Sequence, residues 1–384
     1  GRSLHACGRG KLKMPIEDVG YRKWEGARLS WVFSWLIMVW SGVQIARRSL
    51  WVRRALIIAW LPTVYLGAGM FLFENTMSQR QWRELDAVED MMFLDSRGGS
   101  AGISFSNIEE EIEEVGEEAV RHRIWSWMLA TFLSYPQSFC SLLLIGLLAP
   151  PLISRDIRSR AFLIYFSKPI GRLEYLAGKL SILGLFLAFI TLVPATGLYV
   201  FGVFLSPNLS VIFDTWDLPF RVMVASLVFV VPTASIALMF SSLTIESRYA
   251  AFAWFALWGL GFTAWQVIRL SLVNVYFREM RQSDFSDLGG IEPAFPGGPR
   301  PPRFNEDFPG MDAGADLMAM ATAKADESYW SLLSLYDSLV RLQSWILGYD
   351  AQMEFPWAQA LLVISLSVAA FVVLLRRVSA PIRV

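Results

Sequence analysis

The chain has 384 residues, of which 54% are hydrophobic and 18% charged, and its mean hydropathy is +0.43. Because an ordinary soluble domain carries about 25% charged residues, this composition favours a membrane protein over a soluble one. The 34 basic residues cancel the 34 acidic ones, which argues against nucleic acid as a partner, and two cysteines with two histidines exclude a disulfide scaffold and a cysteine-rich metal site.

The N-terminal part of the chain is polar before it becomes apolar. Residues 1–28 form this polar lead, so we expect a cytoplasmic segment and no signal peptide; whether residues 1–13 are native stays open. Placed on a helix, residues 29–54 present a narrow polar stripe opposite aromatic side chains that include Trp35 and Trp40. Since tryptophan favours the headgroup level of a membrane, we predict an interfacial (elbow) helix, with a true membrane span as the alternative.

Six stretches are apolar and long enough to cross a bilayer as helices, which takes about 20 residues each. They cover residues 55–73, 124–153, 180–205, 222–243, 250–268 and 357–375. Four of them contain an internal proline, at Pro62, Pro136, Pro194 and Pro232, and we expect each proline to kink its helix. The predicted fold is an all-α polytopic membrane protein with six transmembrane helices.

The charged residues predict how these helices are oriented. Lysine and arginine are concentrated near residues 154–179 and in the tail 376–384, which the positive-inside rule assigns to the cytoplasm together with both termini. The other side receives two large acidic extracytoplasmic loops, residues 74–123 and 274–356. The first contains a charged helix over residues 109–120. The net charge of zero therefore results from a basic inner face and an acidic outer face whose charges cancel.

The larger outer loop has two parts of different character. Residues 289–309 are rich in glycine and proline and are expected to be irregular or disordered. Residues 329–347 recover helical spacing and predict an amphipathic helix that rests on the outer membrane interface or caps the bundle. Arg221 and Arg269 lie at outer span ends, where we expect their side chains to snorkel to the interface.

No pattern of catalytic residues emerges along the chain. Residues 171–179 (GRLEYLAGK) superficially resemble a phosphate loop, but the glycine spacing is too long and Leu180 stands where a Mg²⁺-binding Ser or Thr belongs. The sequence has neither a G-x-S-x-G nor an H-E-x-x-H motif. An intramembrane enzyme would need acid–base groups at membrane depth, which the spans lack. We therefore predict that the chain is not an enzyme and binds no catalytic metal or cofactor.

One connection between spans is too polar and too patterned to be a passive loop. Ile153 and Ile157 fall on one side of a helix, and four charged residues are expected to be exposed: Arg155, Asp156, Arg158 and Arg160. Pro169 breaks the chain before a second short helix. A short amphipathic helix that projects into the cytoplasm suits docking into a groove of a partner protein. The alternative is positive-inside anchoring without a partner.

This connection resembles the first cytoplasmic segment of the type-2 ABC transporter permease family. The matching residues are Asp156, Lys168, Pro169, Ile170, Arg172, Gly178 and Lys179. The sequence departs from the family at Ser159–Arg160, where members usually carry Gly-Thr. Six spans, inner termini and an interfacial helix before the first span also agree with the family.

The resemblance implies a permease subunit of an ABC transporter, of the exporter type, in the inner (cytoplasmic) membrane. It further implies a homo- or heterodimer of permeases, surrounded by membrane lipids and bound to two separate ATPase subunits, which hold the ATP and Mg²⁺. The implied ATPase-coupling segment comprises Ile153, Arg155, Asp156, Ile157, Arg158, Arg160, Lys168, Pro169 and Arg172. The alternative function is a non-transporting membrane anchor or scaffold whose outer loops bind an extracytoplasmic partner.

Aromatic residues of the fifth predicted span bear on the unidentified substrate. They are Phe252, Trp254, Phe255, Trp258, Phe262 and Trp265. Such a wall would tolerate a lipid-like or amphipathic substrate. The same residues also fit ordinary packing or contact with lipid, and we favour that second interpretation.

Overall fold

The structure, a computed structural model, describes residues 31–79, 108–161, 171–287, 313–348 and 353–379. The polar lead, the glycine- and proline-rich stretch 289–309 and residues 380–384 lie outside the described residues. All regular structure in the described ranges is helical. The elements are α1 (Trp31–Arg47), α2 (Leu50–Gln79), α4 (Ile108–Val115), α5 (Glu117–Phe132), η3 (Leu133–Gln137), α6 (Ser138–Leu148), α7 (Pro150–Arg158), α9 (Arg172–Ile190), α10 (Leu192–Leu205), α11 (Val211–Asp214), α12 (Leu218–Leu243), α13 (Ser247–Asp287), α14 (Ala313–Asp326), η4 (Tyr329–Leu333), α15 (Leu335–Leu347) and α16 (Trp357–Ser379).

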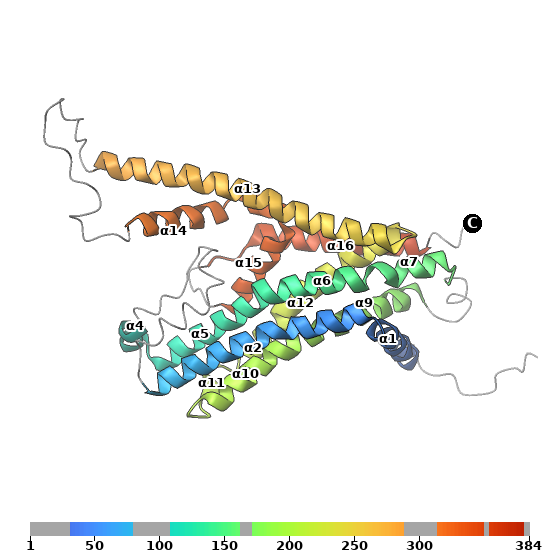
Figure 1. Ribbon diagram of the computed structural model, residues 1–384, viewed down its shortest axis with the longest axis horizontal. Coiled ribbons are helices and arrows are strands. Elements are labelled where there is room, and N and C mark those ends of the chain that lie inside the picture. Colours follow the sequence, from blue (N-terminus) through green and yellow to red (C-terminus); the bar gives the residue numbers. More distant parts are fainter. Residues whose placement is uncertain (1–30, 80–107, 162–170, 288–312, 349–352, 380–384) are drawn as a thin grey trace, which may run out of the picture.

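Six helical segments of the described chain are long and apolar enough to cross a membrane, which confirms the predicted all-α fold with six spans. They are Leu50–Ser78, Ser138–Arg158, Arg172–Leu205, Leu218–Leu243, Ser247–Arg281 and Trp357–Val378. The spans run side by side as an elongated bundle (Figure 1). We call its two ends the α7 end, where α1, α7 and the end of α16 lie, and the α4 end.

Proline and glycine interrupt the helices in different ways. The second predicted span is divided into α5, η3 and α6, because Pro136 has no N–H to donate and the chain makes a π-helical turn around it. The charged helix expected over residues 109–120 is split by Gly116, whose φ of 96° is a conformation that glycine adopts readily. The third span bends at Thr191, just before Pro194. Pro62 and Pro232 instead lie inside single helices, α2 and α12.

Two spans extend well beyond their predicted bounds. Helix α9 begins at Arg172 rather than near residue 180: Glu174 accepts a hydrogen bond from the N–H of Gly171 at its start, and Lys179 faces Asp156 of α7. Helix α13 has 41 residues and continues past the bundle at the α4 end, with α14 beside it (Figure 1). Arg269 of α13 holds Asp326 of α14 through two hydrogen bonds, 2.5 and 2.8 Å long. Arg269 therefore has a partner on another helix, and its snorkelling to the interface stays a prediction.

Burial is uneven among the spans. Helix α12 is the centre of the bundle: 67% of its most apolar window is buried, against 17% for α13. Helix α15, which corresponds to the predicted amphipathic segment, packs against α12, α16 and α5 through Leu335, Leu339 and Leu342. It thus caps the bundle.

The aromatic wall of α13 separates into two sets. Trp254, Trp258 and Trp265 are buried in the bundle, and the indole of Trp254 donates to the carbonyl of Leu142 at 3.0 Å. The phenylalanines are exposed, Phe252 most of all at 74%. The tryptophans are therefore packing residues.

Helix α1 is not among the six candidate spans. It lies at the α7 end (Figure 1) and packs closely on α9: a Cβ on Gly42 would lie 2.2 Å from the side chain of Ile182, and one on Gly178 2.9 Å from Met38. Whether α1 lies in the membrane interface stays a prediction.

Candidate functional site

Helix α7 follows α6 almost directly, and it begins with two prolines, which favour the start of a helix. Pro150 and Pro151 occupy the first helical turn, where the backbone N–H groups have no partner inside the helix and proline's fixed φ is favourable. Ile153 is fully buried, Ile157 is half-buried, and Arg155 and Arg158 are exposed. The predicted amphipathic helix is thus present, with its arginine face turned outward.

A serine of α12 fixes the first turn of α7. The hydroxyl of Ser241, which is fully buried, accepts hydrogen bonds from the N–H groups of Ile153 (3.1 Å) and Ser154 (3.2 Å) and donates to the carbonyl of Pro150 (2.7 Å). The hydroxyl of Ser241 thus binds backbone N–H groups near the start of α7. An N-cap side chain does the same from within its own helix, whereas Ser241 does so from another helix. Sequence reasoning missed this residue, whose only signal is a small polar side chain near the end of a span.

An ion pair fixes the second turn of α7 to α9. The carboxylate of Asp156 lies 2.8 Å from Nζ of Lys179 and accepts a hydrogen bond from the hydroxyl of Tyr175 at 2.7 Å. Tyr175 is fully buried, and the side chains of Asp156 and Lys179 are 15% and 11% exposed. The prediction that Asp156 is exposed is therefore wrong, because its carboxylate forms an ion pair with Lys179 of the same chain.

The exposed residues of the segment are arginines. Arg155, Arg158, Arg160 and Arg172 all face outward at the α7 end. Arg160 ends α7 with φ at 54°, and bonds from Arg160 N–H to the Ile157 carbonyl (3.2 Å) and from Ala161 N–H to the Asp156 carbonyl (3.0 Å) close the helix. Lys168, Pro169 and Ile170, which were also predicted to belong to this segment, lie outside the described residues.

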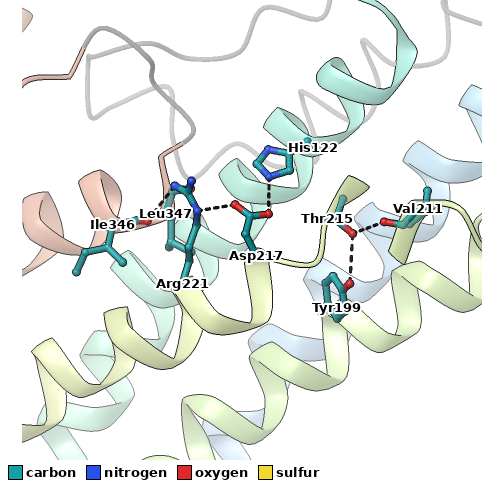
Figure 2. A network of polar contacts seen from close by, with 8 residues as sticks. All are labelled: His122, Tyr199, Val211, Thr215, Asp217, Arg221, Ile346 and Leu347. Atoms are coloured by element: carbon teal, nitrogen blue, oxygen red, sulfur yellow. Dashed lines mark hydrogen bonds and ion pairs between the residues drawn. The ribbon is translucent and has the colours of Figure 1, made fainter. Parts of the chain in front are cut away.

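A second polar network lies at the α4 end and joins α5, α12 and α15 (Figure 2). Nε2 of His122 lies 2.9 Å from Oδ1 of Asp217, while Nε of Arg221 donates to Oδ2 of the same carboxylate at 2.7 Å. The guanidinium of Arg221 also donates to the carbonyls of Ile346 and Leu347 at the end of α15. Arg221 is thus tied to α15, and its snorkelling to the membrane interface stays a prediction.

The pKa values of two aspartates near α15 are shifted in opposite directions. Burial alone would raise the pKa of Asp217, but the hydrogen bond from His122 and the charges of His122 and Arg221 outweigh it and hold this pKa below its usual value. Burial raises the pKa of Asp337, in the first turn of α15, despite a hydrogen bond with Ser334. Oδ2 of Asp337 is buried, and no hydrogen-bond donor in the described part of the chain reaches it.

We expect asparagine at these two positions to change stability with opposite sign. Asp217→Asn should lower the melting temperature at pH 7; the difference from the wild type should shrink as the pH falls below about 4, the usual pKa of an aspartate, and vanish once the pH is below the lowered pKa of Asp217. Asp337→Asn should raise the melting temperature at pH 7, and this gain should vanish as the pH falls through the raised pKa of Asp337. Thermal unfolding of both variants in detergent across this pH range tests the prediction, which shifts of equal sign would contradict.

The described residues contain no group of three His, Cys, Asp or Glu side chains placed to hold a metal ion. The arrangement at the α7 end is of another kind: a short helix with an exposed basic face, joined to two spans by buried polar contacts.

Comparison with known proteins identifies the family. A family model described as an ABC-2 family transporter protein matches residues 40–375, from within α1 to within the last turns of α16. Comparisons with curated proteins and with solved structures gave no match. Since the family match covers most of the chain and all six spans, it confirms the resemblance seen in the sequence. The chain belongs to the ABC-2 family of transporter proteins, as a membrane permease subunit.

Proposed function

We propose that the chain is the permease of an ATP-driven exporter and that α7 docks into a groove of a separate ATPase subunit. The observation that carries the proposal is the construction of α7. Its exposed side offers Arg155 and Arg158, while Ser241 and Lys179 hold its other side against α12 and α9. A helix held in this way moves with two spans at once, as a coupling element must.

The proposed orientation places the α7 end in the cytoplasm and the permease in the inner membrane. Exposed arginines gather at this end, on α1, α2, α7, α9 and α16: Arg47, Arg48, Arg53, Arg54, Arg155, Arg158, Arg160, Arg172, Arg376 and Arg377. At the opposite end α4 carries exposed acidic residues such as Glu113 and Glu114. This asymmetry is the one that the positive-inside rule describes.

In the proposed assembly two permease copies meet in the membrane and two ATPase subunits bind ATP and Mg²⁺ beneath them. The family match supports the ATPase partner and a dimer. The wide apolar surfaces of α2, α13 and α16 leave room for a second copy, since no more than 28% of the apolar window of each is buried. ATP binding drives such a switch only by the amount by which it favours one of the two conformations over the other.

Co-purification tests the proposal. Tagged permease is expressed with its neighbouring genes, purified in mild detergent, and the proteins that accompany it are identified. The wild type should retain an ATPase, and Arg155→Glu with Arg158→Glu should lose it, because both exposed contacts reverse their charge. Arg376→Glu with Arg377→Glu is the matched control, since it makes the same change on exposed residues of α16.

Two outcomes would overturn the docking proposal. The first is a wild-type permease that is monodisperse but retains no ATPase. The second is a control variant that loses the ATPase as fully as the α7 variant, which would assign the effect to net charge at this end rather than to α7.

A further inference from the structure

Four exposed arginines crowd the corner between α1 and α2. Arg47, Arg48, Arg53 and Arg54 lie within eight residues, and the sequence has no acidic residue between Glu25 and Glu74. Within the described ranges, no ion pair engages any of the four. The corner therefore presents a cluster of positive charge that the described chain does not neutralise.

An exposed stripe leads from this corner along α2. Trp51, Arg54, Ile58, Leu61 and Tyr65 are spaced by three and four residues, so they share one helix face, and all five are exposed. The guanidinium of Arg54 lies 5.6 Å from the ring centroid of Trp51. The arrangement, with a cation and a tryptophan at one end and apolar side chains beyond, is typical of a membrane interface.

The stripe ends in an apolar cavity of about 370 Å³. Ile58, Leu61 and Tyr65 line one side, and Thr131, Pro136 and Cys140 line the other. The cavity lies where Pro136 turns the second span into a π-helix, so the chain on that side follows an irregular course beside α2. Its lining is almost wholly apolar, as a site for a hydrocarbon requires.

The distance between arginine and cavity fits a lipid. Eleven residues separate Arg54 from Tyr65, which is about 16 Å along a helix. Half of the hydrocarbon core of a bilayer is about 15 Å thick. An acyl chain whose headgroup lies beside Arg54 therefore reaches the far end of the cavity.

We propose that this face of α2 binds one anionic phospholipid, with its phosphate at Arg53 and Arg54 and an acyl chain in the cavity beside Pro136. Four arginines that form no ion pair with the described residues select a headgroup with net negative charge over a zwitterionic one. The proposal is independent of the docking of α7, because it uses neither an α7 residue nor an ATPase.

Protection of Cys140 tests the proposal in the full-length chain. In a Cys7→Ala background, delipidated protein in detergent is treated with N-ethylmaleimide in the presence of phosphatidylglycerol, phosphatidylcholine or inorganic phosphate. Phosphatidylglycerol should slow the reaction of Cys140 most. Arg53→Gln with Arg54→Gln should weaken this protection by roughly 30-fold in lipid concentration, since each basic residue near an anionic surface contributes about a factor of five. Arg376→Gln with Arg377→Gln should leave protection unchanged.

Three results would overturn it: equal protection by phosphatidylcholine, protection by phosphate alone, or full protection of the Arg53/Arg54 variant by phosphatidylglycerol. Protection that rises with protein concentration in the absence of lipid would assign the face to a second copy of the chain instead. Because Leu61→Trp places a large ring in the cavity, it should block protection by phosphatidylglycerol while the arginines remain intact. A Leu61→Trp variant that is protected normally would also count against the proposal.

Discussion

Asp156→Lys is expected to release the ATPase from the permease, and adding Lys179→Asp is expected to restore it. The two side chains are 2.8 Å apart and mostly buried, so the single change places two positive charges in one site. Removing one partner of a buried ion pair costs about 3–5 kcal/mol. Since α7 is short and joined to α9 mainly here, we expect it to move rather than the bundle to unfold. The double exchange returns opposite charges to the site, and the hydroxyl of Tyr175 can then accept from the new lysine.

The measurement is the amount of ATPase retained on the purified permease, together with the ATPase rate of the complex. Glu246→Lys is the control, because Glu246 and Arg248 also form an ion pair, at 2.7 Å, but are 43% and 72% exposed. Exposed pairs contribute little, so this change should have a small effect. If the double exchange does not recover the ATPase while the protein remains folded, the Asp156–Lys179 pair does not position α7.

The six spans could be predicted from the sequence because a run of apolar side chains long enough to cross a bilayer is a local property. The ends of the spans could not be predicted in the same way. A charged residue usually marks the end of a span, but here some charged residues lie inside the helices. Helix α9 contains Lys179 inside its second turn, where Asp156 neutralises it. Helix α13 runs on to Asp287, far past its apolar part, alongside α14. In both cases the helix continues through charged residues that have a partner on another helix, Asp156 for Lys179 and Asp326 for Arg269.

The short amphipathic helix α7 was predicted in outline, and the error at Asp156 has a physical reason. A helical projection places Asp156 on the polar side of α7, which is correct, but α9 also lies on that side. Its partner Lys179 is 23 positions further on, beyond residues whose structure is not described. By contrast, the pair Asp217–Arg221 has i,i+4 spacing and was within reach of sequence reasoning.

Arg121→Met is expected to lower the free energy of unfolding by about 3–5 kcal/mol. Glu74 lies near the end of α2 and is 1% exposed, and its carboxylate is 3.4 Å from the guanidinium of Arg121 on α5. The indole of Trp125 donates to the same carboxylate oxygen at 2.8 Å. Without Arg121 the carboxylate of Glu74 still accepts the hydrogen bond from Trp125 but has lost its buried positive partner.

A double-mutant cycle distinguishes loss of this charge pair from loss of packing. Glu74→Gln with Arg121→Met should be clearly more stable than the sum of the two single changes allows, because it removes both charges and leaves an amide oxygen for Trp125 to bond. Glu117→Gln is the control: Glu117 also contacts Arg121, at 2.9 Å, but is 49% exposed, so its loss should cost less than about 1 kcal/mol. Additive single effects would mean that Arg121 stabilises the α2–α5 contact through its aliphatic stem alone. A coupling of more than about 1 kcal/mol would show that the buried charges themselves join α2 to α5 at the α4 end.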